Sequence, residues 1–173
     1  MIQESYRIAY RDELTGLPSR RAFNDAMASL GRRYAIAMLD VDHFKKFNDT
    51  HGQDIGDQLL RLVAAKLRET TGGGKPFRYG GEEFAILMEE ADGRAAVATA
   101  ERIRESIKKE VYHSEIGSFS CTMSLGVATF PEDATAKGRL TVCADEALYA
   151  AKHGGRDQVV RWADMKTQHK QAG

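Results

Sequence analysis

The sequence predicts one α+β domain, in which helices surround a central, mostly antiparallel sheet of five strands. Two observations support this class. Segments with strand and helix periodicity follow each other in the order strand, helix, hairpin, helix, strand, helix, strand, and a Gly80–Gly81 pair between two strand-like segments indicates the hairpin. The 173 residues, 42% of them apolar and 29% charged, suit one soluble domain with a sizeable core.

The N-terminal elements follow from capping residues and apolar runs. Residues 1–11 are expected to form a linker helix from an upstream domain, and residues 12–18 form a turn. Ser19 is a suitable N-cap for a helix that ends near Leu30. The continuous apolar segment from Tyr34 to Val41 predicts a buried strand, because it ends at a charge.

A helix over residues 54–68 is predicted by its apolar spacing, and the glycines at 72–74 end it. The hairpin of residues 77–79 and 84–88 comes next, because a Gly-Gly centre tolerates the positive φ angles of a tight turn. Glu82 and Glu83 would lie at its tip with their side chains on opposite faces. The apolar face of the helix is expected to hold Ile55, Leu59, Leu62, Val63 and Leu67.

The C-terminal half is expected to add two helices and two strands. Apolar and polar residues alternate from Phe119 to Val127, which predicts a half-buried strand. A helix over residues 140–153 stops at Gly154–Gly155, residues 158–162 form a short strand, and residues 163–173 form a polar, frayed tail. A helix over residues 93–110 is expected to bury Ala96, Ala100, Ile103 and Ile107, and the later helix Leu140, Ala144, Ala147, Leu148 and Ala151.

The charge balance excludes some partners. Lys and Arg together number 25 and so do Asp and Glu, so the molecule has no overall field that attracts nucleic acid or an anionic membrane. Cys121 and Cys143 lie in apolar, patterned segments, which predicts buried free thiols and a reducing, cytoplasmic location. The longest apolar run is too short to span a bilayer, although a parent protein could still be anchored in a membrane.

Two acidic clusters are the main candidates for a functional site. Asp40 and Asp42 follow the buried strand and would face one side if the strand continued. If the hairpin lies beside this strand, Glu82 and Glu83 converge on them, and carboxylates with substrate phosphates are the ligands that Mg²⁺ prefers. Taken alone, Asp40 and Asp42 could equally be the surface end of a strand.

Nearby polar residues could bind a nucleotide. Lys45 and the backbone N–H groups around Phe44 could neutralise phosphate charge. Asn48 and Asp57 could recognise guanine, because a carboxylate accepts hydrogen bonds from its N1–H and its exocyclic amine. Each has a simpler interpretation, as a solvated lysine or as a helix cap or exposed polar residue.

Lys152 and Arg156 flank a Gly-Gly turn, where cations often only complement the dipole of a helix C-terminus. Competing motifs are not supported. Gly72 to Lys75 looks like the end of a phosphate loop, but Pro76 replaces the required Ser or Thr and a strand follows. No histidine pair has metal-ligand spacing, and no serine motif indicates a hydrolase triad.

These motifs together resemble a GGDEF domain, the catalytic domain of diguanylate cyclases, over nearly all of residues 12–160. Several ordered motifs at consistent spacing are more specific than any one of them. They are Asp12-Glu13-Leu14-Thr15-Gly16-Leu17, Asp40-Val41-Asp42-His43-Phe44-Lys45, Asn48-Asp49, Gly56-Asp57, Arg78-Tyr79, Gly80-Gly81-Glu82-Glu83-Phe84, Ser124-Leu125-Gly126-Val127-Ala128, Ala147-Leu148-Tyr149-Ala150-Ala151-Lys152 and Gly155-Arg156.

The resemblance implies a fold like the palm of nucleotide cyclases and polymerases, and the condensation of two GTP into cyclic di-GMP and two pyrophosphates. It also implies a residue for each role. Glu82 would help deprotonate the ribose 3′-OH, and Lys45, the second implied catalytic residue, would hold the phosphates and the developing charge. The implied ligands of Mg²⁺ or Mn²⁺ are Asp40, the Val41 carbonyl and Glu82, with Glu83 in addition; the implied substrate contacts are Phe44, Lys45, Asn48, Gln53, Asp57, Lys152 and Arg156.

The partners implied are GTP, an upstream sensory domain and a second copy of the chain. Each domain holds one GTP, so two must face each other in a two-fold homodimer, at least transiently. We expect the isolated domain to have low activity, because a short linker helix cannot hold two copies together. The alternative function is a catalytically weak GTP-binding regulatory module. A third possibility is a cyclase with relaxed substrate choice that makes mixed dinucleotides. Asp57 disfavours it, because a carboxylate pairs well with guanine and poorly with adenine.

Two departures from the family pattern matter. Gln53 stands where many members carry His, which puts a nucleotide contact in doubt. Product-inhibited members carry an Arg-x-x-Asp site shortly before the signature, and the matching positions here are Thr71-Gly72-Gly73-Gly74. We therefore predict no allosteric product site of that kind.

Overall fold

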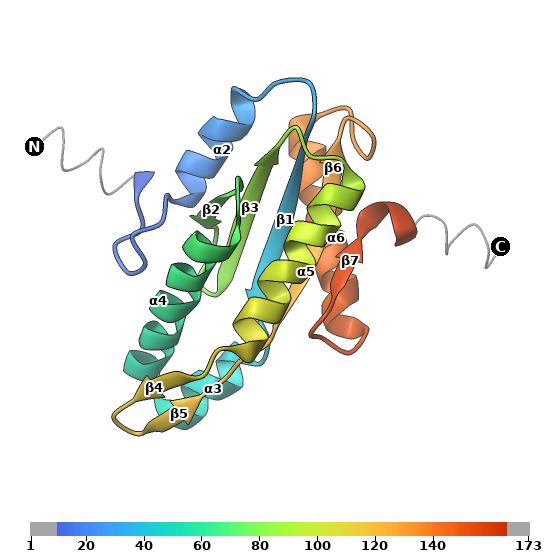
Figure 1. Cartoon of the computed structure of the whole chain (residues 1–173). Helices are drawn as coiled ribbons and strands as arrows, with labels where there is room; N and C mark the ends of the chain where they lie inside the picture. Colours follow the sequence, from blue (N-terminus) through green and yellow to red (C-terminus); the bar gives the residue numbers. More distant parts are fainter. Residues whose placement is uncertain (1–9, 166–173) are drawn as a thin grey trace, which may run out of the picture.

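The computed structural model describes residues 10–165, and its centre is a five-stranded sheet in the order β2–β3–β1–β6–β7 (Figure 1). β1 pairs antiparallel with β3 and β6, β2 pairs antiparallel with β3, and β7 runs parallel to β6. The mostly antiparallel sheet is therefore confirmed. The strands are β1 (Tyr34–Val41), β2 (Lys75–Arg78), β3 (Glu83–Glu89), β6 (Met123–Phe130) and β7 (Val159–Arg161).

Helices cover both faces of this sheet, with α4 and α5 in front and α6 behind in Figure 1. One core cluster joins α4 and α5 to the sheet, and a second joins α2 and α6 to its other face. The helices are α2 (Arg20–Ala28), α3 (Phe44–His51), α4 (Gln53–Thr70), α5 (Gly93–Lys109) and α6 (Lys137–His153).

β1 lies at the centre and is buried along its whole length. Successive strand residues point to opposite faces, so Leu39 packs toward α4 and α5 while Met38 packs toward α2 and α6. A strand covered on both sides needs an unbroken apolar run, which explains the composition of residues 34–39. Its C-terminal end is where polar residues begin, at Asp40.

Gly126 sets how closely α6 approaches the sheet. A Cβ atom at this position would lie 2.2 Å from the backbone N of Leu148 and 2.3 Å from the backbone O of Ala144. Only glycine permits this contact, because both atoms belong to the helix backbone and cannot rotate away. The close approach brings the last turn of α6, with Lys152, over the end of β1.

Several local expectations are confirmed. The side chain of Ser19 caps α2 by accepting a hydrogen bond from the Ala22 N–H, although the helix ends at Ala28. Cys121 and Cys143 are free thiols, of which Cys143 is buried and Cys121 partly so. All the inward-facing residues expected in α5 and α6 are buried.

Other expectations are wrong. The strand expected over residues 119–127 is β6, Met123–Phe130, and it is buried on both faces because α5 and α6 each cover one. Leu62 is 39% exposed, and Leu60 takes its place in the core. The pattern also missed α3 and a small hairpin of β4 (Tyr112–Ser114) and β5 (Gly117–Phe119).

The segments expected at the two ends of the chain fall only partly within the described residues. Residues 1–9 of the expected linker helix and residues 166–173 of the expected tail lie outside the described residues. Among the described residues, residues 162–165 form a helical turn after β7. The helix expected over residues 54–68 is α4, which begins earlier, at Gln53.

Candidate active site

An open pocket of about 700 Å³ lies between the C-terminal end of β1, the helices α3 and α4, and the turn from β2 to β3. The antiparallel register places Asp40 of β1 directly opposite Glu83 of β3. The Val41 N–H donates to the Glu82 carbonyl at 3.4 Å, which ties the turn to β1. Seven of the residues singled out in the sequence line this pocket, namely Asp40, Phe44, Asn48, Gln53, Asp57, Glu82 and Glu83.

Asp40 is a buried carboxylate with one oxygen engaged and one left over. It is 8% exposed, and its Oδ2 pairs with the ammonium group of Lys152. Its Oδ1 is buried and has no hydrogen-bond partner among the described residues. Burial raises the pKa of Asp40, and Lys152 offsets only part of that shift. A buried oxygen without a partner is suited to a cation, because a metal ligand would satisfy it.

Glu82 and Glu83 are both half-buried, and burial raises the pKa of each. The pKa of Glu83 rises to about 7, because burial is reinforced by Asp145 of α6, which shares a hydrogen bond with it. For Glu82 the second cause is the neighbouring charge of Asp40. These carboxylates repel one another, and a divalent cation would relieve the repulsion.

A metal centre is not assembled among the described residues. Within residues 10–165, no three His, Cys, Asp or Glu side chains are grouped closely enough to hold an ion. Asp40 pairs with Lys152, and Glu83 shares a hydrogen bond with Asp145. Mg²⁺ takes few protein ligands and completes its shell with water and phosphate, so the donors fit a site that substrate completes.

Asp42 does not share the pocket with Asp40, which overturns the expectation that the two face one site. Strand β1 ends at Val41, and the Asp42 carboxylate accepts hydrogen bonds from the hydroxyls of Thr122 at 2.7 Å and Ser124 at 2.6 Å. It also accepts one from the Asp157 N–H at 3.0 Å. Asp42 therefore joins three segments of the chain, and both of its carboxylate oxygens are engaged in hydrogen bonds.

The glycine turn is wider than the tight hairpin expected from the sequence. Neither Gly80 nor Gly81 has a positive φ, and both the Tyr79 and Gly80 N–H groups donate to the Glu83 carbonyl. Arg78 holds this shape, because its guanidinium donates to the carbonyls of Gly80 at 3.2 Å and Gly81 at 2.7 Å.

Arg78 also binds both carboxylate oxygens of Asp12, at 3.1 and 3.0 Å. The ion pair between Asp12 and Arg78 therefore attaches the turn of residues 12–18 to the glycine turn. Asp12 and Arg78 both belong to motifs that carry the family resemblance, but the sequence alone assigns no role to either. No signal in the sequence could have joined them, since they are 66 positions apart.

Helices α3 and α4 contribute Asn48 and Asp57 to the same pocket as Asp40, Glu82 and Glu83. Asn48 packs against Gly56, where a Cβ would lie 1.7 Å from the Asn48 Oδ1. That Oδ1 is buried and has no hydrogen-bond partner among the described residues. Asn48 and Asp57 thus line one pocket, and the Oδ1 of Asn48 is directed toward Gly56.

The three cations predicted to contact the phosphates do not line this pocket. Lys45 and Arg156 are exposed and do not line the pocket. Lys152 reaches it only through its ion pair with Asp40. The pocket is therefore lined by the residues predicted to bind guanine and metal, whereas Lys45 and Arg156 are not among its lining residues.

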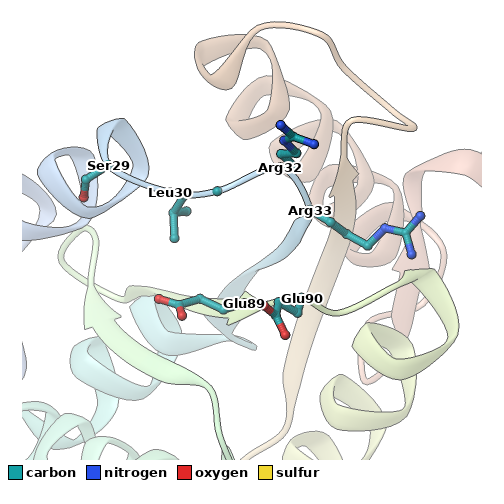
Figure 2. Close-up of a pocket in the computed structure, with 7 residues that line it drawn as sticks. Ser29, Leu30, Arg32, Arg33, Glu89 and Glu90 are labelled. Carbon is teal, nitrogen blue, oxygen red and sulfur yellow. The ribbon is translucent and has the colours of Figure 1, made fainter.

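A different hollow lies at the opposite end of β1 and β3 and holds none of the predicted site residues. Figure 2 shows Arg32 and Arg33, on the loop before β1, across from Glu89 and Glu90. Its charges are partly paired already, because Arg33 contacts Glu132 at 3.7 Å and Glu89 contacts Lys75 at 3.5 Å. The chemistry of the molecule therefore concentrates at the other end of the sheet.

Comparisons with known proteins agree with this geometry. The family model described as "Diguanylate cyclase, GGDEF domain" matches residues 9–158. The response regulator PleD of Caulobacter vibrioides is 36% identical over 169 residues, which cover 92% of this chain and 37% of the relative. Diguanylate cyclase VdcA of Vibrio cholerae is 39% identical over 158 residues, which cover 86% and 46%.

Solved structures show the same likeness. The coiled coil and GGDEF domain of DgcB from Caulobacter crescentus, in complex with c-di-GMP, gives a TM-score of 0.83 at 32% identity, over 92% of this chain and 89% of that one. Diguanylate cyclase SiaD of Pseudomonas aeruginosa, with its activator SiaC, gives 0.82 at 34% identity, over 92% and 65%. The chain spans less than half the length of the curated relatives compared above. No helix within residues 10–165 is long and apolar enough to cross a membrane.

Proposed function

The chain belongs to the GGDEF family of diguanylate cyclases, and on that premise we propose that it condenses two GTP molecules into cyclic di-GMP and two pyrophosphates. The observation that carries the proposal is the composition of one pocket. Asp40, Glu82 and Glu83 line this pocket together with Asn48 and Asp57. A nucleotide bound across this pocket would have its base and its phosphates in chemically different surroundings.

Asn48 and Asp57 form the guanine end. The Asp57 carboxylate accepts hydrogen bonds from the guanine N1–H and exocyclic amine, and adenine offers no matching pair of donors on that edge. Asn48 lines the same pocket and supplies an amide that can meet the ring edge of guanine. Gln53 and Phe44 complete this part of the pocket wall. GTP is therefore preferred over ATP.

The carboxylates form the phosphate end. Asp40, Glu82, Glu83 and the Val41 carbonyl would hold Mg²⁺ or Mn²⁺, and the unpartnered Oδ1 of Asp40 supports this assignment. A divalent cation, when bound, supplies charge neutralisation for the triphosphate and the leaving group. Lys45, Lys152 and Arg156 add positive charge around the same phosphates.

The reaction is a displacement at phosphorus. The ribose 3′-oxygen of one GTP bonds to the α-phosphorus of the other, the bond from that phosphorus to the bridging oxygen breaks, and pyrophosphate leaves. Glu82 accepts the 3′-OH proton. Burial and the nearby charge of Asp40 raise the pKa of Glu82, which favours proton uptake. Two such steps close the ring, so two chains must face each other as a two-fold homodimer.

The alternative function is a GTP-binding regulatory module with little turnover. One observation favours it: the side chain of Asp40 is engaged with Lys152, and that of Glu83 with Asp145. A module of this kind binds GTP and leaves it unchanged. An active cyclase consumes it, so the two functions separate in one assay.

The experiment incubates the protein with GTP and Mg²⁺ and resolves the products by chromatography. We expect cyclic di-GMP and pyrophosphate from the native chain and no product from Glu82→Gln, which should still bind GTP. Glu89→Gln, at the other end of β3, is the matched control and should keep activity. GTP binding without any cyclic product from the native chain would refute the cyclase proposal and support the regulatory module.

Two further measurements test the homodimer and the predicted loss of product inhibition. Activity should rise more steeply than linearly with protein concentration, and a strictly linear dependence would argue against dimeric catalysis. The turn at residues 71–74 has no charged side chain. We therefore expect calorimetry to detect no cyclic di-GMP binding at this turn, and micromolar, metal-independent binding there would contradict the expectation.

A further inference from the structure

The loop between α6 and β7 carries Arg156 in an unusual backbone conformation. Arg156 has φ 62° and Asp157 has φ 46°, and neither is glycine. Two successive residues in the left-handed region are unfavourable for side chains with a Cβ, and such conformations persist only where surrounding contacts hold them. They tend to occur where a precise side-chain direction matters.

Three contacts hold Asp157 in place. Its Oδ1 accepts from the Arg104 Nη1 at 2.7 Å, and its Oδ2 accepts from the Lys108 Nζ at 2.6 Å. Its N–H donates to Asp42 at the end of β1 at 3.0 Å. Side chain and backbone of the same residue are therefore fixed to two different elements, α5 and the segment after β1.

The anchor on α5 is itself rigid. The Arg104 side chain is only 13% exposed, and its guanidinium also binds Glu101 at 2.9 Å and Glu105 at 2.6 Å. Burial alone would raise the pKa of Asp157, but Lys108 and Arg104 outweigh burial and lower that pKa. Asp157 is therefore an ionised carboxylate at neutral pH, held by two cations.

Arg156 contrasts with its neighbour. Its N–H donates to the Ala151 carbonyl at 3.0 Å, which fixes its backbone. Its side chain is exposed and makes no hydrogen bond or ion pair with any residue in the described range 10–165. Lys152, four positions earlier on α6, contacts Asp40, which lines the pocket, so the loop begins two residues after a contact with a pocket residue. The fold thus fixes the backbone of Arg156 and leaves its guanidinium available.

We propose that Asp157 is a positioning residue, which together with Arg104 and Lys108 fixes the loop that directs Arg156 toward the triphosphate of GTP. The inference rests on the proposed function, because it needs a triphosphate in the pocket. Asp157 itself does not touch the substrate. Its effect is expected on the phosphates of the nucleotide and not on the base, which Asn48 and Asp57 would bind at the other end.

The test compares binding of 3′-deoxy-GTP, which lacks the attacking hydroxyl and cannot react, with binding of guanosine. Asp157→Asn removes the charge that binds Arg104 and Lys108, keeps the N–H that bonds Asp42, and retains a residue that tolerates the left-handed region. We expect it to weaken 3′-deoxy-GTP binding about fivefold and to leave guanosine binding within twofold, as is typical for loss of one coupled contact.

The double variant decides whether the effect passes through Arg156. Arg156→Ala should weaken 3′-deoxy-GTP binding at least as much as Asp157→Asn, and adding Asp157→Asn to it should change little further. Lys109→Met is the matched control, because it removes an exposed charge of α5 beside Lys108 that forms no ion pair with Asp157, and it should bind both ligands normally. If Asp157→Asn unfolds, Lys108→Met removes one of the two ion pairs from an exposed position and is expected to act in the same direction.

The outcomes are distinct. Equal weakening of guanosine and 3′-deoxy-GTP, full additivity with Arg156→Ala, or unchanged binding by a folded Asp157→Asn would each overturn the positioning role alone. If the native chain binds 3′-deoxy-GTP no more tightly than guanosine, the nucleotide site of the proposed function fails and the inference fails with it.

Discussion

The contact between Gly56 and Asn48 predicts a substitution that separates stability from nucleotide binding. In Gly56→Ala, the new Cβ would lie 1.7 Å from the Asn48 Oδ1 and 2.8 Å from its Cγ. These atoms are the end of a side chain, so we expect Asn48 to rotate away while α4 keeps its place. The Oδ1 makes no hydrogen bond among the described residues, so its displacement breaks none.

The expected magnitudes have opposite signs. Ala is favoured over Gly within a helix by up to about 1 kcal/mol, so the free energy of unfolding should stay level or rise by that amount. GTP should lose the hydrogen bond from the displaced amide, which is worth about 1 kcal/mol or a roughly fivefold weaker affinity. The preference for GTP over ATP should shrink by the same factor, because ATP does not use this contact.

Urea denaturation measures the stability, and calorimetric titration with GTP and ATP measures the binding. The double variant Asn48→Ala/Gly56→Ala is the internal control, since a smaller side chain at position 48 leaves room for the new Cβ and Gly56→Ala should then have no further effect on binding. A loss of more than about 2 kcal/mol of stability with unchanged GTP affinity would refute the reasoning, because it would mean that the helix moves instead of Asn48.

Three other predictions concern stability. Because burial and Asp145 raise the pKa of Glu83 from 4.5 to about 7, the folded protein retains a proton there that the unfolded chain has released. In EDTA the free energy of unfolding should therefore fall by roughly 1 kcal/mol, after solvent screening, as pH rises from 4.5 to about 7. Glu83→Gln should remove this dependence on pH. A free energy of unfolding that does not change with pH in the native chain would contradict the raised pKa of Glu83. Asp42→Ala leaves the donors of Thr122, Ser124 and Asp157 without their acceptor and should cost about 2–4 kcal/mol in urea denaturation, whereas a cost below about 1 kcal/mol would show that water replaces it. Gly126→Ala forces α6 away from β6 and should lower stability by about 3 kcal/mol or prevent folding, and a native melting temperature would disprove the close packing.

Much of the fold was predictable because periodicity is a local property. The apolar run of β1 and the helical spacing of α5 and α6 depend only on neighbouring residues, and each is where the sequence predicts it. Helix α3 was missed because it has 8 residues and lacks a capping side chain at His43. The double burial of β6 was missed because alternation reports one covered face, and only the packed helices reveal the second.

The candidate site divides in the same way. The sequence singled out Asp40, Glu82 and Glu83, because acidic residues after an apolar strand and beside a glycine turn are visible in the order of residues alone. It could not separate Asp40 from Asp42, which turned out to be a hydrogen-bond acceptor for a neighbouring strand and loop. The roles of Asp40, Glu82 and Glu83 in catalysis stay predictions, and Glu82→Gln tests that of Glu82.

By itself, then, the sequence determined the family, the class of fold and the types of residue that gather at one end of the sheet. The tertiary structure decided which partner each of these residues has. Asp42 is 80 positions from Thr122 and 115 from Asp157, and Lys152 is 112 from Asp40. Contacts at such separations follow from strand register and from the close approach of α6 at Gly126, and neither is encoded in the spacing of nearby residues.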